Sequence, residues 1–178
     1  MPSEIVTINR APVLTLWAAI VAERLGFDHA EALTLGKAVA GLNAYSKGVR
    51  LGIYRPTPAS IREKRKSARA GEQLHVDLLQ RAVPVVQTAE GLRALAKEKP
   101  VDPAGVERYL VGKFGESLAP VRQAMKHLAA AVPPRDLALR AFALYERFRP
   151  SIPAGERGWG AKGVLHLKLI EQLAKGTR

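Results

Sequence analysis

Hydrophobic residues near the N-terminus recur with the spacing of an α-helix. Between residues 12 and 25 the apolar positions follow i, i+3, i+4, i+7 and i+8, which places them on one stripe of a helix. The members of this stripe are Val13, Leu16, Trp17, Ile20 and Val21. We expect Asn9 to cap this helix and Gly26 to end it, because glycine readily adopts the left-handed conformation found after helices. Trp17 is therefore predicted to lie in the core.

A second helix is predicted directly after the first. Asp28 and Glu31 have the three-residue spacing of a capping box, and the helix is expected to continue to about Ser46. One face of it carries apolar side chains. Its small residues, among them Gly36, would allow a neighbouring helix to pack closely.

The centre of the chain changes from helical signals to turn and strand signals. Residues 47–59 contain two glycines and two prolines, which predict a loop. Residues 60–63 read as another capping box that opens a short basic helix. Leu74 to Leu78 alternate apolar and polar side chains, and 83–86 form a second apolar run, so a β-hairpin is expected. Pro84 should place the second strand at a sheet edge or a bend, because proline lacks a backbone N–H.

Helical patterns return from Thr88 onward. Thr88 is expected to cap a helix that ends near Lys97. The pair Asp102-Pro103 has a capping side chain followed by proline in the first turn, which predicts a helix to Phe114. Further helices are predicted over 118–128 and 134–148, and a strand that turns into a helix over 164–173.

These elements predict a mainly α protein with a minor β-hairpin, of the α+β class. The boundary is expected near 88–100. It would separate residues 1–88, two helices with a basic connector and a hairpin, from residues 89–178, a small helical subdomain.

The composition excludes several classes of protein. The 178 residues include no cysteine, which rules out disulfides, a thiol nucleophile and a cysteine-based zinc site. The longest strongly apolar run, Val13 to Ala22, is too short to cross a bilayer, and no secretory signal pattern is seen. We therefore expect a cytoplasmic protein without membrane insertion. The formal net charge of +12 favours a polyanionic partner.

This charge is concentrated in one short segment. Residues 47–69, called the basic segment below, carry eight basic groups and only one acid, Glu63. Lysine and arginine supply most non-specific affinity for nucleic acids by neutralising phosphates, and tyrosine can stack on exposed bases. The candidate nucleic-acid-binding residues are Lys47, Arg50, Tyr54, Arg55, Arg62, Lys64, Arg65, Lys66 and Arg69.

Residues 21–28 resemble the turn of a helix-turn-helix motif. Ala22 lies four residues before Gly26, where a small side chain lets two helices meet, and apolar residues flank the turn. The order of two helices, a basic element and a hairpin is similar to a winged helix, so the resemblance implies DNA binding. The second helix departs from the motif, because its first turns offer His29, Glu31 and Thr34 rather than basic residues. The basic segment is therefore expected to make the contacts, with weak sequence preference.

A glycine-rich stretch near the C-terminus offers a different ligand site. Gly158 to Gly163 matches the pattern G-x-G-x-x-G, but no strand is predicted before it and no acid lies about 20 residues later, so a dinucleotide fold is not inferred. A simpler phosphate site remains open, with Arg157 and Lys162 contacting the phosphate and Trp159 stacking on a base.

No catalytic constellation is visible along the chain. The four histidines are scattered, and no nucleophile elbow or paired carboxylates occur, so no enzyme activity, cofactor or metal is predicted. Folding could still assemble a site from distant residues. The sequence thus predicts a non-catalytic nucleic-acid-binding protein, for duplex DNA rather than RNA. Two alternatives stay open: a protein-interaction module for an acidic partner, and a phosphate or nucleotide binder that uses 157–163. A homodimer formed by the C-terminal helices is compatible with each.

Overall fold

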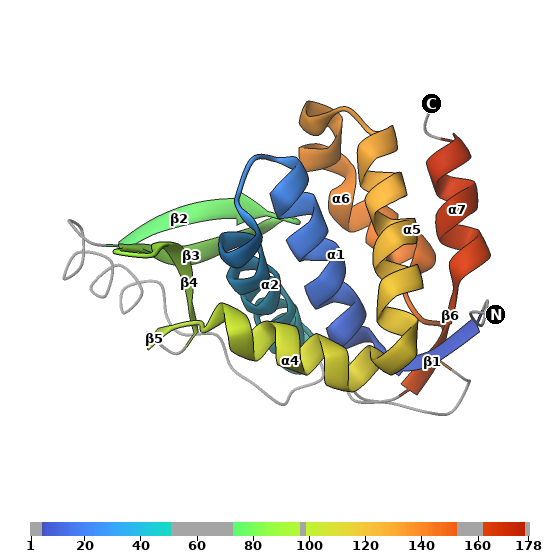
Figure 1. The fold of residues 1–178 in the computed structure, drawn as a ribbon, viewed down its shortest axis with the longest axis horizontal. Helices are drawn as coiled ribbons and strands as arrows, with labels where there is room; N and C mark the ends of the chain where they lie inside the picture. The colour runs from blue at the N-terminus through green and yellow to red at the C-terminus, as the bar shows by residue number, and fades with distance from the viewer. Residues whose placement is uncertain (1–4, 51–72, 97–98, 153–161, 177–178) are drawn as a thin grey trace.

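The computed structural model describes residues 5–50, 73–96, 99–152 and 162–176, with the side chains of 44–50 and 73 left out. Helices pack around one central helix, and a small sheet extends from one side of them (Figure 1). The elements in chain order are β1 (Ile5–Asn9), α1 (Arg10–Arg24), α2 (His29–Arg50), β2 (Gln73–Leu78), β3 (Arg81–Thr88), β4 (Gly91–Ala96), β5 (Lys99–Pro100), α4 (Pro103–Phe114), η1 (Gly115–Ser117), α5 (Leu118–Ala131), α6 (Pro134–Phe148), β6 (Lys162–His166) and α7 (Leu167–Gly176).

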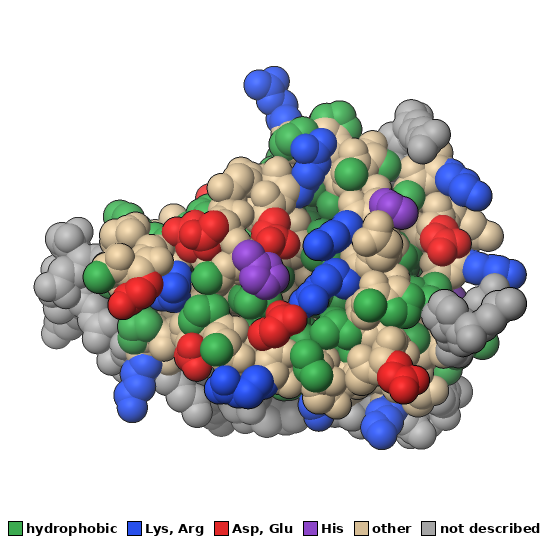
Figure 2. All heavy atoms as spheres, viewed as in Figure 1, with side chains coloured by type: hydrophobic (Ala, Val, Ile, Leu, Met, Phe, Trp, Pro, Cys, Tyr) green, Lys and Arg blue, Asp and Glu red, His purple; other side chains and the backbone are tan. Residues whose placement is uncertain are grey.

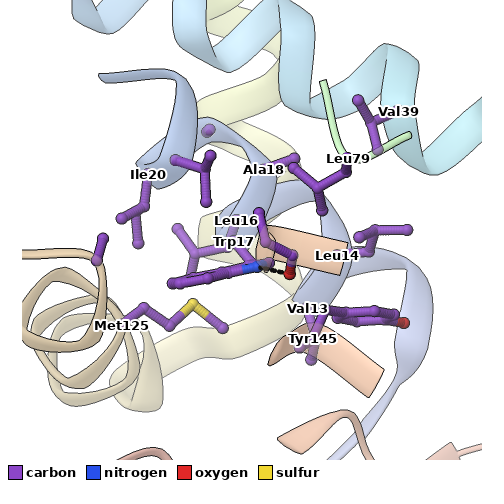
Figure 3. Packing of buried hydrophobic residues seen from close by; sticks show 14 of the residues in the cluster. Val13, Leu14, Leu16, Trp17, Ala18, Ile20, Val39, Leu79, Met125 and Tyr145 are labelled. Atoms are coloured by element: carbon purple, nitrogen blue, oxygen red, sulfur yellow. Dashed lines mark hydrogen bonds between the residues drawn. The ribbon is translucent and has the colours of Figure 1, made fainter. Parts of the chain in front are cut away.

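Helix α1 forms the centre of the core and confirms the first predicted helix. Every residue from Pro12 to Ala22 is buried, so the helix is covered on all sides rather than along one stripe. Trp17 is fully buried, and its Nε1 donates a hydrogen bond of 2.9 Å to the carbonyl oxygen of Ala141 in α6 (Figure 3). Its ring meets Phe148 edge to face, with centroids 5.3 Å apart. Asn9 occupies the N-cap position as expected, but its side chain makes no capping hydrogen bond.

Helix α2 packs against α1 at the small residues, as the sequence suggested. A Cβ added at Gly36 would overlap the carbonyl oxygen of Thr15 and lie 3.0 Å from the backbone nitrogen of Ala19. The capping box is confirmed: the Glu31 N–H donates to Asp28 Oδ1 at 2.7 Å, and the Asp28 N–H donates to Glu31 Oε1 at 3.1 Å. The helix runs to Arg50, so residues 47–50 are helical and the predicted start of the loop is wrong.

The predicted hairpin is confirmed as β2 and β3, which belong to a four-stranded antiparallel meander of order β2-β3-β4-β5. Its turn residues, Leu79 and Gln80, both have positive φ, at 48° and 63°, as a two-residue type I′ turn requires. The expectation for Pro84 is wrong, because β3 lies between two strands. Pro84 is tolerated there because β4 pairs only from Val85 onward, so the missing N–H removes no bond from that ladder.

Strand β4 replaces the helix expected between Thr88 and Lys97. The side chain of Thr88 does bond the local backbone, but it donates to the Gly91 carbonyl and accepts from the Glu90 N–H, which closes a turn between β3 and β4. Gly91 has a φ of 122°, a conformation that suits glycine in such a turn. Tertiary contacts with α2, described below, keep the segment extended.

The C-terminal helices confirm their predicted positions. Asp102 caps α4 by accepting a hydrogen bond of 3.2 Å from the Ala104 N–H, and α4, α5 and α6 follow the predicted ranges closely. The strand that turns into a helix is β6 followed by α7. Strand β6 pairs antiparallel with β1, which the sequence analysis did not predict because the partners lie more than 150 residues apart.

The fold class is mainly α with minor β, as predicted, although the β part exceeds one hairpin. One hydrophobic cluster includes residues from both sides of the expected boundary, among them Trp17, Val39, Val85, Leu128 and Leu144. Among the described helices, none is long and apolar enough to span a bilayer.

Candidate nucleic-acid interface

The basic segment connects the end of α2 to the start of β2. Lys47 and Arg50 lie on the last turns of α2, although their side chains are not described. Tyr54, Arg55, Arg62, Lys64, Arg65, Lys66 and Arg69 lie outside the described residues. The structure therefore describes the elements that hold the segment, and the contacts of its side chains stay a prediction.

Polar side chains of α2 attach the meander to the helices. Glu31 Oε2 accepts a hydrogen bond of 2.9 Å from the Leu92 N–H, and Thr34 Oγ1 accepts one of 3.1 Å from the Ala94 N–H. Nearer the end of α2, the buried Asn43 accepts a hydrogen bond of 3.2 Å from Arg81. Helix α2, which leads into the basic segment, is thus joined to β3 and β4 of the meander that also contains β2.

These contacts use the residues that a helix-turn-helix protein would direct at DNA. Ala32 to Gly36 are buried, while Lys37 is exposed with its Nζ 4.4 Å from the ring centroid of Tyr109. Glu31 and Thr34 are engaged with β4. The described part of α2 therefore offers little surface for reading bases.

The face of the helices shown in Figure 2 carries both signs of charge. Glu107 accepts two hydrogen bonds from Arg122, at 3.0 and 3.1 Å, and His29 lies 3.0 Å from Glu23. A cleft of about 440 Å³ beside the start of α4 is likewise lined by Glu90, Arg93 and Asp102. Mixed charge of this kind is typical of an ordinary solvated surface and does not single out a polyanion.

Residues of the predicted glycine-loop site are described only in part. Arg157 and Trp159 lie outside the described residues. Lys162 is the first residue of β6, where it is exposed and lies opposite Asn9. Within the described part of the chain, no group of three or more His, Asp or Glu residues is arranged to hold a metal ion.

The structure links the start of α1 to the end of α6 through three further residues, and sequence reasoning missed them. Arg10 opens α1, and its Nε donates a hydrogen bond of 3.0 Å to the carbonyl oxygen of Pro150. Arg149 caps the C-terminus of α6, and Tyr145 lies one turn before it. Tyr145 is 1% exposed, and its hydroxyl has no hydrogen-bond partner. No local signal could join Arg10 to residues 139 positions away.

The pKa values of Tyr145 and Arg10 reflect their surroundings. Burial raises the pKa of the Tyr145 hydroxyl to about 12, against the opposing effect of the positive charges of Arg149 and Arg10, and the negative charge of Glu146 adds to the rise. Desolvation by burial lowers the pKa of Arg10, and the charge of Arg149 lowers it further. The two guanidinium groups and the phenol therefore share one electrostatic environment.

We compared the chain with known protein families, curated proteins and solved structures. No family model, no curated protein and no solved structure matches the chain.

Proposed function

We propose that this protein binds nucleic acid, duplex DNA in particular, through phosphate contacts made by the basic segment. The observation that carries the proposal is the near absence of acids there: 47–69 hold eight basic groups and one acid. An ordinary solvated surface mixes both signs, as the described helices do. A run of one sign is instead suited to a phosphate backbone.

The elements next to the basic segment, α2 and the meander, support the same proposal. The two ends of the segment emerge from α2 and β2, and the hydrogen bonds of Asn43 and Thr34 hold α2 against the meander. Fixing the elements on either side of a segment lowers the conformational entropy that the segment loses on binding, so less affinity is lost.

The mechanism we propose is neutralisation of phosphates with release of counterions. Each phosphate contact on B-DNA makes the logarithm of the affinity fall by about 0.9 per tenfold rise in salt concentration. The described part of α2 offers little surface to base edges, so we expect affinity to depend weakly on sequence.

Fluorescence anisotropy of labelled duplex and single-stranded oligonucleotides, measured at several salt concentrations, tests the proposal. The variant Lys64→Ala/Arg65→Ala/Lys66→Ala should bind duplex DNA more weakly, with a salt slope shallower by up to about 2.7. A matched control, Lys113→Ala/Lys126→Ala/Arg135→Ala, removes the same charge from exposed positions on α4, α5 and α6. The control should keep a slope close to that of the wild type.

Two outcomes would overturn the proposal. One is the absence of oligonucleotide binding at low salt, which would turn attention to an acidic protein as the partner of the segment. The other is an equal loss in both triple variants, because this would mean that net charge alone, and not the segment, determines affinity.

A further inference from the structure

The junction between the start of α1 and the end of α6 carries two guanidinium groups, and the charge of one acid, Glu146, also acts on Tyr145 there. Arg10 and Arg149 are both half-buried, and neither makes an ion pair with an acid among the described residues. Buried or half-buried charges are normally paired, because desolvation of an unpaired ion is costly. The charge of Arg149 lowers the pKa of Arg10, whose side chain is hydrogen-bonded to the next residue, Pro150, so an anion that reached both guanidinium groups would be stabilised by them.

The backbone around these residues is held firmly. Ser151 and Val164 exchange two hydrogen bonds of 3.0 Å, which attach the chain after α6 to β6. A Cβ at Gly163 would lie 2.9 Å from the Cβ of Pro150, so β6 and Pro150 are in close contact. Pro150 in turn accepts the hydrogen bond from Arg10. The position of Arg10 relative to Arg149 is thus set by the β1–β6 pairing and not by surface side chains alone.

Tyr145 supplies a polar group that lacks a partner. Its ring packs against Phe142 and Phe148, and its hydroxyl is buried without a hydrogen bond. Leaving a buried hydroxyl without a hydrogen bond is unfavourable, because its interaction with water is lost and not replaced. The hydroxyl is therefore free to donate a hydrogen bond to an acceptor that reaches it.

The N-terminus of α1 adds to the positive electrostatic potential around Arg10. Its first turn contains no acid, and its N-cap side chain makes no hydrogen bond. The N-terminus of a helix carries the positive end of the macrodipole, which favours an anion nearby.

We propose that Arg10, Arg149 and Tyr145 form a binding site for an oxyanion of the phosphate class. The two guanidinium groups would donate charge-assisted hydrogen bonds to it, and the Tyr145 hydroxyl would donate a further one. This inference does not rest on the proposed role of the basic segment. The phosphate has two sources in this chemistry: a small ligand such as inorganic phosphate or a nucleotide, and the backbone of a nucleic acid.

Isothermal titration of the full chain with inorganic phosphate at low salt and pH 7 tests the site. Arg149→Met should weaken phosphate binding about tenfold, which corresponds to the loss of one charge-assisted hydrogen bond. The control Arg147→Met removes a charge two residues away, from an exposed position of the same helix, and should leave the affinity within about twofold of the wild type.

Tyr145→Phe provides a second test, which removes one oxygen and keeps the ring packed against Phe142 and Phe148, whose ring centroids are 5.9 and 6.0 Å from that of Tyr145. Without phosphate this variant should melt no lower than the wild type, because an unsatisfied hydroxyl has been removed. With phosphate it should bind several-fold more weakly and gain less thermal stability than the wild type. Tyr109→Phe serves as the matched control and should behave as the wild type does.

Parallel titrations with AMP and with a duplex oligonucleotide separate the two sources. If Arg149→Met weakens only phosphate and AMP, the ligand is a small phosphate compound. If it also makes the duplex salt slope shallower by about 1, the site contacts the nucleic-acid backbone. The Lys64/Arg65/Lys66 triple variant should leave phosphate affinity unchanged, so failure of the basic segment and failure of this site are told apart. The proposal is overturned if phosphate produces no binding heat, or if Arg149→Met and Tyr145→Phe both retain wild-type affinity.

Discussion

The contact between α1 and α2 depends on the absence of a single side chain, and replacing Gly36 by alanine perturbs it directly. The added Cβ would meet the Thr15 carbonyl oxygen inside van der Waals contact, and would lie 3.0 Å from the Ala19 nitrogen and 3.1 Å from the Ala19 Cβ. Two of these three atoms belong to the backbone of α1, which cannot rotate away as a side chain can. Because α1 is buried from Pro12 to Ala22, moving it would disturb its packing against α5 and α6 as well.

The size of the effect follows from two opposing contributions. Overpacking of a well-packed interior costs about 1–3 kcal/mol and occasionally more. Replacing glycine by alanine within a helix recovers up to about 1 kcal/mol of helix propensity. Because α1 is held from several sides, the overpacking cost should lie in the upper part of its range, so after the propensity gain we expect Gly36→Ala to lower the free energy of unfolding by about 1–2 kcal/mol. For a chain of this size, this corresponds to a melting temperature lower by roughly 2–8 °C.

The same helix supplies the matched control. Gly41 is exposed, and a Cβ added there meets nothing within 4 Å. Gly41→Ala should therefore raise the free energy of unfolding by about 0.5–1 kcal/mol through propensity alone. Urea denaturation followed by circular dichroism at 222 nm measures both variants. If Gly36→Ala proved as stable as Gly41→Ala, the close approach of α1 and α2 would not exist as described.

Two further predictions concern buried polar groups. Thr34→Val keeps the side-chain volume but leaves the buried Ala94 N–H without an acceptor, so we expect a loss of about 1–3 kcal/mol in the free energy of unfolding. Hydrogen exchange across 91–96 should accelerate in this variant and stay slow in Thr34→Ser, which retains the hydroxyl; equal exchange in both would contradict the proposed anchoring role. The pKa of Tyr145 is raised to about 12 in the folded protein, so folding favours the neutral phenol. The stability that this preference contributes is fully present below about pH 10 and is lost as the pH rises from about 10 to 12. Stability should then fall by roughly 2–3 kcal/mol over that window, and Tyr145→Phe should show a flatter pH dependence in urea melts between pH 9 and 11.5; parallel curves would refute the assignment.

The local signals of the chain were sufficient wherever an element is defined by its own neighbours in sequence. The Asp28 and Glu31 capping box, the Asp102 cap before Pro103 and the apolar spacing of α5 and α6 each act within a few residues, and each appears in the structure. The same reasoning placed Trp17 in the core and the hairpin at β2 and β3. The charge of the basic segment is also a property of sequence alone.

The errors occur where distant contacts override local preference. Residues 91–96 have helix-forming composition, yet they are extended because Glu31 and Thr34 of α2 accept hydrogen bonds from the N–H groups of Leu92 and Ala94. A helix would satisfy those N–H groups internally, so no local pattern distinguishes the two outcomes. Pro84 was expected in an edge strand because proline has no N–H to donate to a neighbouring strand. It is accommodated in the inner strand β3 because the pairing with β4 begins only at Val85.

The same division, between what local sequence determines and what tertiary contacts decide, applies to the fold and to the candidate sites. Periodicity, caps and charge, each read over short stretches, determined by themselves the helical class, the position of most helices and the basic segment. Only the tertiary structure decided that α1 is covered on every side, that β1 pairs with β6, and that Arg10 lies beside Arg149 and Tyr145. The physical reason is that caps and helical periodicity are short-range interactions along the chain, whereas strand pairing and side-chain clusters depend on which distant segments the folded core brings into contact.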